Sequence, residues 1–234
     1  MKQETHLIVK KSTDISYIQD FKNLEYLDIE GGKDIGFENI GKLENLKTLL
    51  LHFITINNLN FIANAKIDYL LFDGCRLNCD LFVLSQSNLQ ALVLSENHKL
   101  IDLHIIERIS TLKKLSITQS KPTELFDFSN LIHLDELHLI GMKSLDSIAY
   151  LSSAKSLKTL YINEISTKLK AKDFEILLDL PSLKNLYIDF LDYGKKRIKE
   201  VKEMFINAGK SHVLKEELIV LVPQNHPTLI KKTE

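Results

Sequence analysis

Charge of one sign, disulfide-forming cysteine and long apolar runs are all scarce in this sequence, and each shortage excludes a class of protein. Lysine and arginine number 30 against 31 aspartate and glutamate residues, which leaves a formal net charge of −1. Without excess positive charge the chain lacks the basic surface that phosphate binding requires, so we expect no nucleic-acid partner. No stretch approaches the roughly 20 apolar residues needed to span a bilayer, so we expect no membrane segment.

The two cysteines, Cys75 and Cys79, are too few to build a disulfide framework in a chain of 234 residues. Zinc usually takes about four ligands from two paired sets, and no second set accompanies this pair. We therefore expect neither a metal nor a cofactor. The chain begins with the polar segment Met1–His6 rather than with a charged segment leading into an apolar run. This beginning favours a cytoplasmic protein.

What the sequence does have is a short phrase that recurs along most of its length. A leucine-like residue is followed by two others, then by leucine, one other residue, and finally leucine, isoleucine or phenylalanine. The copies are Leu24/Leu27/Ile29, Leu46/Leu49/Leu51, Ile67/Leu70/Phe72, Leu89/Leu92/Leu94, Leu112/Leu115/Ile117, Leu134/Leu137/Leu139, Leu157/Leu160/Ile162 and Leu183/Leu186/Ile188. Their first positions are spaced by 22, 21, 22, 23, 22, 23 and 26 residues. A degenerate copy at Leu7 and Val9 precedes these eight copies and predicts about nine strands.

These residues resemble the leucine-rich repeat family and its L-x-x-L-x-L-x-x-N pattern over roughly residues 5–192. The short period looks most like the bacterial internalin-type subclass. The resemblance implies a solenoid fold and no particular activity, because this architecture carries many unrelated partners. The family's asparagine position is held here by Ser12, Gly32, Ile54, Cys75, Asn97, Ser120, Met142, Ile165 and Leu191. Only Asn97 keeps the amide that bonds to the turn backbone, so we expect irregular turns elsewhere.

The physical properties of the phrase predict the same α/β fold. Successive side chains of a strand point to opposite faces, so Leu-x-Leu directs two side chains inward, and a single repeat cannot bury them. Stacked repeats can, through a parallel sheet with strands about 4.8 Å apart. We therefore expect a right-handed parallel solenoid of about nine strands. A period near 22 residues leaves room only for short 3₁₀ or extended segments on the convex side.

The longest interval and the C-terminal region depart from this pattern. In the 26-residue interval, Asp173 is expected to cap a helix that turns Phe174 and Leu177 inward. Residues 195–208 predict an amphipathic helix and residues 218–222 a buried strand, which together would cover the last repeat. The expected domains are a solenoid at 1–192 (an N-terminal cap strand plus eight repeats), a helix-strand cap at 193–223 and a polar tail at 224–234.

The repeat register also predicts which side chains lie next to one another on the solvent-facing side of the sheet. The central column comprises Ile8, Asp28, Leu50, Leu71, Val93, Ser116, His138, Tyr161 and Tyr187. The column before it comprises His6, Tyr26, Thr48, Tyr69, Ala91, Lys114, Glu136, Thr159 and Asn185. The column after it comprises Lys10, Glu30, His52, Asp73, Ser95, Thr118, Ile140, Asn163 and Asp189.

One charged group on this face is a candidate for chemistry. Glu30, His52 and Asp73 fall on three successive strands of the last column, and a carboxylate–imidazole–carboxylate set can bind a divalent metal or orient a general base. A solvated ladder of alternating charge is the simpler interpretation. No serine or cysteine nucleophile lies beside His52, and a flat sheet excludes water poorly. A metal-dependent enzyme is therefore the weakest alternative, and we assign no catalytic residue.

An apolar block on the same face is the stronger candidate. Leu50, Leu71 and Val93, flanked by Tyr69 and Ala91, are expected to face solvent, where they contribute nothing to the core. Exposed apolar and aromatic surface usually marks an interaction site. The predicted partner-binding residues are Tyr26, Leu50, Tyr69, Leu71, Val93, His138, Tyr161 and Tyr187. We expect a non-catalytic protein-protein interaction module, either a toxin-neutralising immunity protein or a regulatory adaptor, with a secreted or surface adhesin as the alternative.

Overall fold

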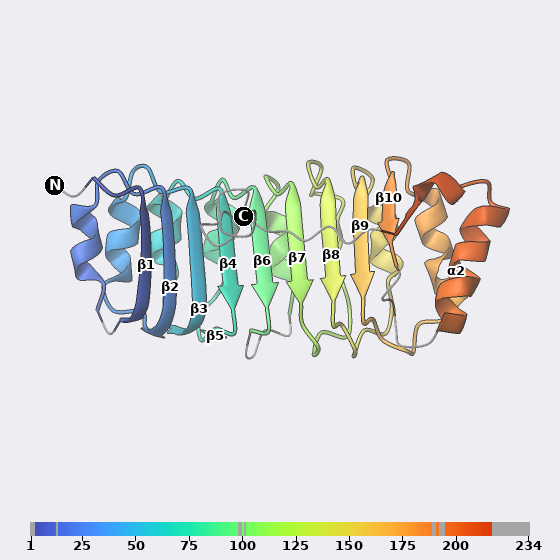
Figure 1. Ribbon diagram of the computed structural model, residues 1–234, viewed down its shortest axis with the longest axis horizontal. Coiled ribbons are helices and arrows are strands. Elements are labelled where there is room, and N and C mark those ends of the chain that lie inside the picture. The colour runs from blue at the N-terminus through green and yellow to red at the C-terminus, as the bar shows by residue number, and fades with distance from the viewer. Residues whose placement is uncertain are drawn as a thin grey trace, which may run out of the picture.

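The computed structural model describes residues 3–12, 14–97, 100, 102–188, 191 and 195–216. In this part of the chain, 11 strands form one open sheet in which every pairing is parallel (Figure 1). The principal strands, in spatial and sequence order, are β1 (His6–Ser12), β2 (Tyr26–Lys33), β3 (Thr48–Ile56), β4 (Tyr69–Asp73), β6 (Ala91–Ser95), β7 (Lys114–Thr118), β8 (Glu136–Ile140), β9 (Thr159–Asn163) and β10 (Asn185–Tyr187). The short strand β5 (Arg76–Leu77) pairs with β3, and β11 (Leu214–Lys215) pairs with β10.

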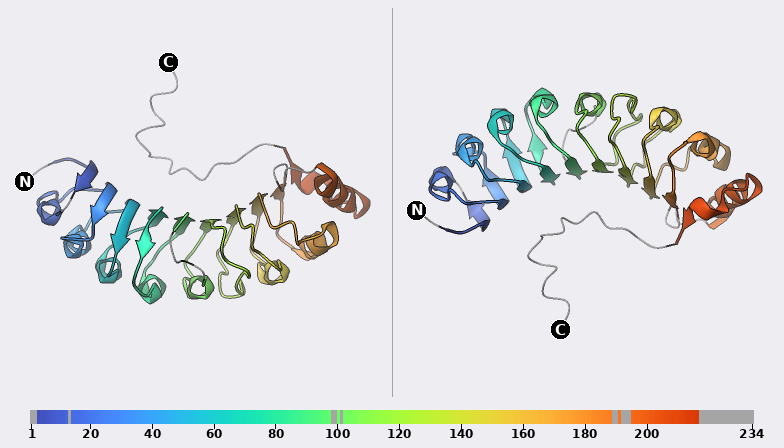
Figure 2. Two further views of the ribbon diagram at one scale, coloured as in Figure 1. Left: turned by 90° about the horizontal axis from the view of Figure 1, so that it is seen from below. Right: turned by 90° about the horizontal axis from the view of Figure 1, so that it is seen from above.

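Short helical segments form the second layer. They are η1 (Ser16–Asp20), η2 (Phe37–Lys42), α1 (Asn60–Asn64), η3 (Phe82–Gln86), η4 (His104–Arg108), η5 (Ala149–Ser153), η6 (Ala171–Asp179), α2 (Lys195–Asn207) and η7 (Ser211–Val213), where η denotes a 3₁₀ helix. Figure 2 shows both layers bent into an arc, with the strands on the concave side and the helical segments on the convex side. The expected solenoid with short convex segments is confirmed.

The middle leucine of each phrase is the centre of the fold. These residues are fully buried from β2 to β10, and they are Leu27, Leu49, Leu70, Leu92, Leu115, Leu137, Leu160 and Leu186. The sheet register pairs each of them with the next, as Leu92 with Leu115. One cluster of buried apolar side chains therefore runs along the stack between the two layers. The predicted register is correct.

Short polar side chains begin many of the convex segments. Asp80 and Asp102 each accept a hydrogen bond from the backbone N–H two residues further on, at 2.7 and 2.8 Å. Asp14 accepts a similar bond at 2.8 Å. Aspartate favours such local bonds because its short side chain reaches the nearby backbone. The bonds satisfy N–H groups that the first turn of a helix leaves without a partner.

A left-handed residue occurs at the same place in most repeats, directly after the last concave column. It is Lys11, Gly31, Phe53, Gly74, Glu96, Gly141 and Glu164, each with positive φ. The turns therefore share one recurring bend despite the missing asparagines, although Gln119 at the equivalent place lacks positive φ. The strands β2 and β3 even continue past this bend, since Gly32 pairs with Ile54. Buried apolar side chains such as Ile54 and Met142 fill the turn interior, so packing replaces the amide hydrogen bonds.

Phe53 is unusual among these left-handed residues. A bulky side chain at φ 55° is disfavoured, and this one is 63% exposed. Its ring lies over Gly74 of the next repeat, where an added Cβ would collide with the ring. Glycine at position 74 therefore serves two purposes, since it adopts positive φ and leaves room for the phenyl ring.

Asn97 behaves as the repeat pattern predicts. Its Oδ1 accepts the backbone N–H of Cys75 at 3.1 Å, and its Nδ2 donates to the carbonyl of Phe72 at 3.0 Å. Cys75 itself is buried, and its Sγ donates to the carbonyl of Leu51 at 3.2 Å. One asparagine thus connects the turns of neighbouring repeats.

The C-terminal region agrees only partly with expectation. In the longest interval Asp173 does not occupy the cap position, because it lies inside the 3₁₀ helix η6 and accepts the backbone N–H of Lys170 at 2.7 Å. The amphipathic helix expected at 195–208 is present as α2 and buries Val201 and Phe205. The strand predicted at 218–222 and the tail at 224–234 lie outside the described residues, so the domain boundaries stay a prediction. Of the helices that are described, none has the length and apolar content to cross a membrane.

Removing one central leucine should measure how much this stacked core contributes. Leu115→Ala deletes a fully buried side chain and should lower the free energy of unfolding by about 2–5 kcal/mol through cavity formation. Chemical denaturation monitored by circular dichroism provides the measurement. Ile132→Ala is the matched control, because Ile132 is 65% exposed and its loss should change stability by less than about 0.5 kcal/mol. Equal effects of the two substitutions would contradict the register.

Candidate partner-binding face

The three predicted columns are the three rows of side chains on the concave face. Backbone pairing aligns the central column without a break from Ile8 on β1 to Tyr187 on β10. The same pairings align the column before it from His6 to Asn185. The column after it is aligned from Lys10 onward, and its last predicted member, Asp189, lies outside the described residues. We call the eight predicted partner-binding residues, which all stand on this face, the concave layer.

The central column is more buried than the sequence suggested. Leu50 is 1% exposed and Val93 is 9% exposed, whereas Leu71 between them is half-buried. The expectation that this apolar block faces open solvent is therefore wrong for Leu50, Val93 and the flanking Ala91, which is also 9% exposed. Strands about 4.8 Å apart on the inside of a curve leave each side chain little more room than its own width, so the flanking columns cover the central one. None of the three leucine and valine side chains belongs to the core cluster.

Aromatic rings supply both ends of the concave layer. Toward the C-terminal end, the ring centroids of His138 and Tyr161 lie 5.3 Å apart, and those of Tyr161 and Tyr187 lie 6.2 Å apart. Toward the N-terminal end, Tyr26 stacks on His6 at 5.5 Å. These distances are those of rings in favourable contact. These rings are thus held in place by one another.

Two polar atoms on this face are buried without a hydrogen-bond partner among the described residues. They are the hydroxyl oxygen of Tyr69 and the Oδ1 of Asn163. Burial also raises the pKa of the Tyr69 hydroxyl to about 12. A buried polar group without a partner costs free energy, about 1–3 kcal/mol. Such groups are satisfied when a binding partner or an ordered water supplies the missing bond.

The charged candidate set is rearranged relative to expectation. His52 does lie beside Asp73, with Nδ1 3.2 Å from Oδ2. Its other nitrogen, Nε2, lies 3.5 Å from Oδ1 of Asp28 rather than beside Glu30. Glu30 instead contacts Lys10 at 3.9 Å. The signal for Asp28 was present in the sequence, because diagonal neighbours on adjacent strands are within reach of long side chains.

A shallow pocket adjoins this histidine. It has a volume of about 280 Å³ and is lined by Asp28, Glu30, His52 and Phe53. Sequence reasoning missed Phe53, because its position follows the strand and nothing in the repeat pattern marks an exposed aromatic there. Among the described residues, no three histidine, cysteine, aspartate or glutamate side chains are grouped so as to hold a metal ion.

A second charged cluster occupies β7 and β8. Glu136 lies 3.0 Å from Nζ of Lys114 and 3.0 Å from Nε2 of His138. Burial by itself raises the pKa of the Glu136 carboxyl, but the bonds from His138 and Lys114 outweigh burial, so that pKa lies below its ordinary value of 4.5. His138 is 2% exposed, and the carboxylate satisfies its ring nitrogen. This cluster orders the middle of the concave face.

Neither cysteine is prepared for chemistry. Burial raises the pKa of the Cys75 thiol and of the Cys79 thiol to about 11 each. Both sulfurs are therefore protonated near neutral pH, whereas the thiolate is the form that binds metals and attacks electrophiles.

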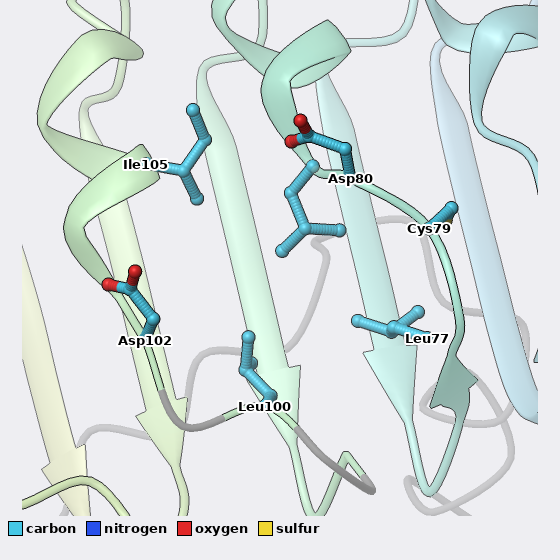
Figure 3. A pocket seen from close by; sticks show the side chains of 7 residues that line it. Leu77, Cys79, Asp80, Leu100, Asp102 and Ile105 are labelled. Atoms are coloured by element: carbon cyan, nitrogen blue, oxygen red, sulfur yellow. The ribbon is translucent and has the colours of Figure 1, made fainter.

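Cys79 also lines a pocket away from the concave face, between the repeats of η3 and η4 (Figure 3). Its volume is about 220 Å³, and Leu77 and Leu100 form part of its wall. Asp80 and Asp102 stand at its edge, where each accepts a backbone hydrogen bond at the start of a 3₁₀ helix. These carboxylates thus have a structural role.

Two proteins of known structure are similar to this chain. No protein-family model and no curated protein matches this chain. An internalin of Listeria monocytogenes is 18% identical, with 92% of this chain and 87% of that chain covered and a TM-score of 0.35. A leucine-rich repeat protein of Leptospira interrogans is also 18% identical, with 92% of this chain and 64% of that chain covered and a TM-score of 0.46. This chain thus spans slightly less than two thirds of the Leptospira protein. The open, all-parallel sheet of repeated strands fits a leucine-rich repeat fold.

The Glu136 cluster gives a pH-dependent prediction. Glu136→Gln removes the charge and should lower stability near neutral pH by about 1–2 kcal/mol, because a buried carboxylate with two charged or polar partners is lost. The folded-state pKa of Glu136 is depressed, so its contribution is complete above the unfolded value of 4.5 and is lost as pH falls through the lower folded value. The difference in melting temperature between wild type and variant should therefore shrink as the pH is lowered from neutrality to about 3. A difference that stays constant over this range would contradict the assignment.

Proposed function

We propose that this protein is a non-catalytic module that binds a protein partner on its concave face. The observation that supports the proposal most directly is the concave layer itself. It gathers aromatic and apolar side chains on the concave side of the sheet, outside the core cluster, although most of them are buried by their neighbours. It also holds the Tyr69 hydroxyl, which has no hydrogen-bond partner among the described residues. A face that combines ordered aromatic side chains with an unsatisfied polar group is suited to binding a partner.

The size of the face suits a protein. The nine principal strands are separated by eight intervals of about 4.8 Å, which gives an arc of roughly 40 Å. A strand of five residues adds roughly 16 Å, so the face covers on the order of 600 Å². An ordinary protein interface uses about 800 Å² on each partner. The loops at the rim therefore have to add only a modest further area.

The surface pockets favour a macromolecule over a small molecule. The pockets beside His52 and beside Cys79 hold about 280 and 220 Å³, at or below the lower end of the range of roughly 300–1,000 Å³ for small-molecule sites. His52 is engaged by two carboxylates, and the two thiols are protonated near neutral pH. These features support a role in binding rather than in catalysis. Within this class we favour a cytoplasmic bacterial immunity protein or regulatory adaptor.

Leu71 is the best residue for testing this proposal. It is the apolar member of the central column on β4, and unlike its neighbours it remains partly accessible to solvent. Leu71→Glu places a charge in surface that the complex must desolvate, so it should weaken binding by about 2 kcal/mol or more. Folding should persist, since part of this side chain already meets solvent. The measurement is capture of partners from the native cell by wild type and variant, followed by calorimetric titration of the partner found.

Ile132→Glu provides the matched control, because it adds the same charge at a residue that is 65% exposed outside the concave sheet. We expect it to bind like wild type. A Leu71→Glu protein with normal circular dichroism and full affinity would move the binding site away from the concave layer.

The unpaired hydroxyl of Tyr69 gives a second test in which stability and binding change in opposite directions. Tyr69→Phe removes a buried oxygen that has no partner among the described residues. The free protein should be as stable as wild type or more stable by about 1 kcal/mol. Affinity should fall by about 0.5–1.5 kcal/mol if the partner bonds to this hydroxyl. Loss of stability with unchanged affinity would show that the hydroxyl is satisfied within the free protein, and would argue against its role in binding.

A further inference from the structure

The strand β1 lies at one edge of the sheet that the described residues form. Within the described residues, β1 pairs only with β2 and stands at the end of the strand order. The carbonyl of Thr5 accepts the backbone N–H of Tyr26 at 3.0 Å. Backbone groups alternate in direction along a strand, so Leu7 and Val9 also face β2. The N–H and C=O groups of His6, Ile8 and Lys10 face outward from the edge.

Apolar groups accompany this edge in both layers. Ile8 is 46% exposed on the concave side, and Tyr17 on η1 is 44% exposed in the convex layer. Leu7 packs against the core cluster but is only partly buried. An edge with outward backbone groups and apolar neighbours is a template for pairing with another strand.

The order of charges along the edge matches a second copy of the same strand. Glu4 precedes β1, and Lys10 lies near its end. A two-fold interface requires a surface complementary to itself. If two β1 strands pair antiparallel with His6 opposite Ile8, then Glu4 of each copy lies opposite Lys10 of the other. The alternative register with Ile8 opposite Ile8 would instead place Lys10 opposite His6 and lose both ion pairs.

We propose that two copies of this chain associate through antiparallel pairing of their β1 strands in the first of these registers. The outward residues Glu4, His6, Ile8 and Lys10 then all form backbone hydrogen-bonded pairs. The two Leu7 side chains meet at the two-fold axis on the core side of the sheet. Since opposite residues of an antiparallel pair point to the same side, the two concave faces join into one continuous surface.

The area buried between the two β1 strands indicates how strong the dimer should be. The seven residues of β1 extend roughly 23 Å, and two layers packed about 10 Å apart give a depth of roughly 20 Å. The contact therefore buries on the order of 450 Å² per copy, about half of the ~800 Å² of an ordinary stable interface. The dimer should consequently form in the micromolar range of protein concentration rather than at nanomolar concentration.

Charge reversal tests the pairing in sedimentation velocity experiments over a concentration series. Wild type should shift from a monomer of 26.9 kDa toward twice that mass. Glu4→Lys and Lys10→Glu should each weaken dimerisation by about tenfold, because each makes two like-charged pairs across the axis. The double variant restores opposite charges across the axis and should recover dimerisation, while the contact of Lys10 with Glu30 inside each copy stays lost. Lys155→Glu, at an exposed residue of a convex segment, is the control and should leave the dimer unchanged.

Amide hydrogen exchange gives a second readout that does not depend on charge. The N–H groups of Ile8 and Lys10 should exchange rapidly in dilute protein and become protected at high concentration. The N–H groups of Leu7 and Val9 should be protected throughout, because they bond to β2. Wild type that stays monomeric at high concentration would overturn the proposal. So would single charge variants that dimerise like wild type, or a double variant that fails to recover.

Discussion

The stacked core and the concave surface of this protein both depend on one constraint. Backbone hydrogen bonding holds the parallel strands at a fixed spacing of about 4.8 Å. No single repeat can bury its own leucines, so each depends on the next. The spacing then decides how Leu92 stacks on Leu115 and how close their outward neighbours Val93 and Ser116 must come. Core and surface are therefore governed by the same pairing, and a change in register would disturb both.

On the concave side this constraint produces a surface with properties between those of a core and those of open surface. Leu50 is almost completely covered although it stands outside the core cluster, and Tyr161 is held between His138 and Tyr187. Side chains that are already ordered lose little conformational entropy when a partner docks. The same ordering leaves the Tyr69 hydroxyl buried without a hydrogen-bond partner in the part of the chain that the structure describes. Close packing on the inside of the arc therefore both orders the concave side chains and leaves a polar group among them without a hydrogen bond.

The sequence alone was sufficient to predict the register of the strands. Predictions that depend on register were therefore correct, whereas those that depend on curvature or packing were not. A period near 22 residues and the Leu-x-Leu alternation determine which residue lies beside which, so all three columns follow from counting. Counting does not reveal how strongly the sheet curves, and for that reason the burial of Leu50 and Val93 was missed. It also aligns His52 with Glu30, whereas the side chain reaches diagonally to Asp28. The missing asparagines suggested irregular turns because the repeat pattern does not show that a packed side chain such as Ile54 can replace their hydrogen bonds.

The contact of Phe53 with Gly74 has a consequence for how such a chain changes in evolution. The ring occupies the space where any larger residue at position 74 would place its Cβ. A larger residue at the equivalent place would therefore require the exposed Phe53 ring to move aside. A tandem duplication of that repeat would place a second phenylalanine at the position that Gly74 now holds. The order of the two repeats therefore affects how they pack. Repeats that look interchangeable in sequence are therefore not equivalent at this junction, because exchanging them would require the Phe53 ring to be repositioned.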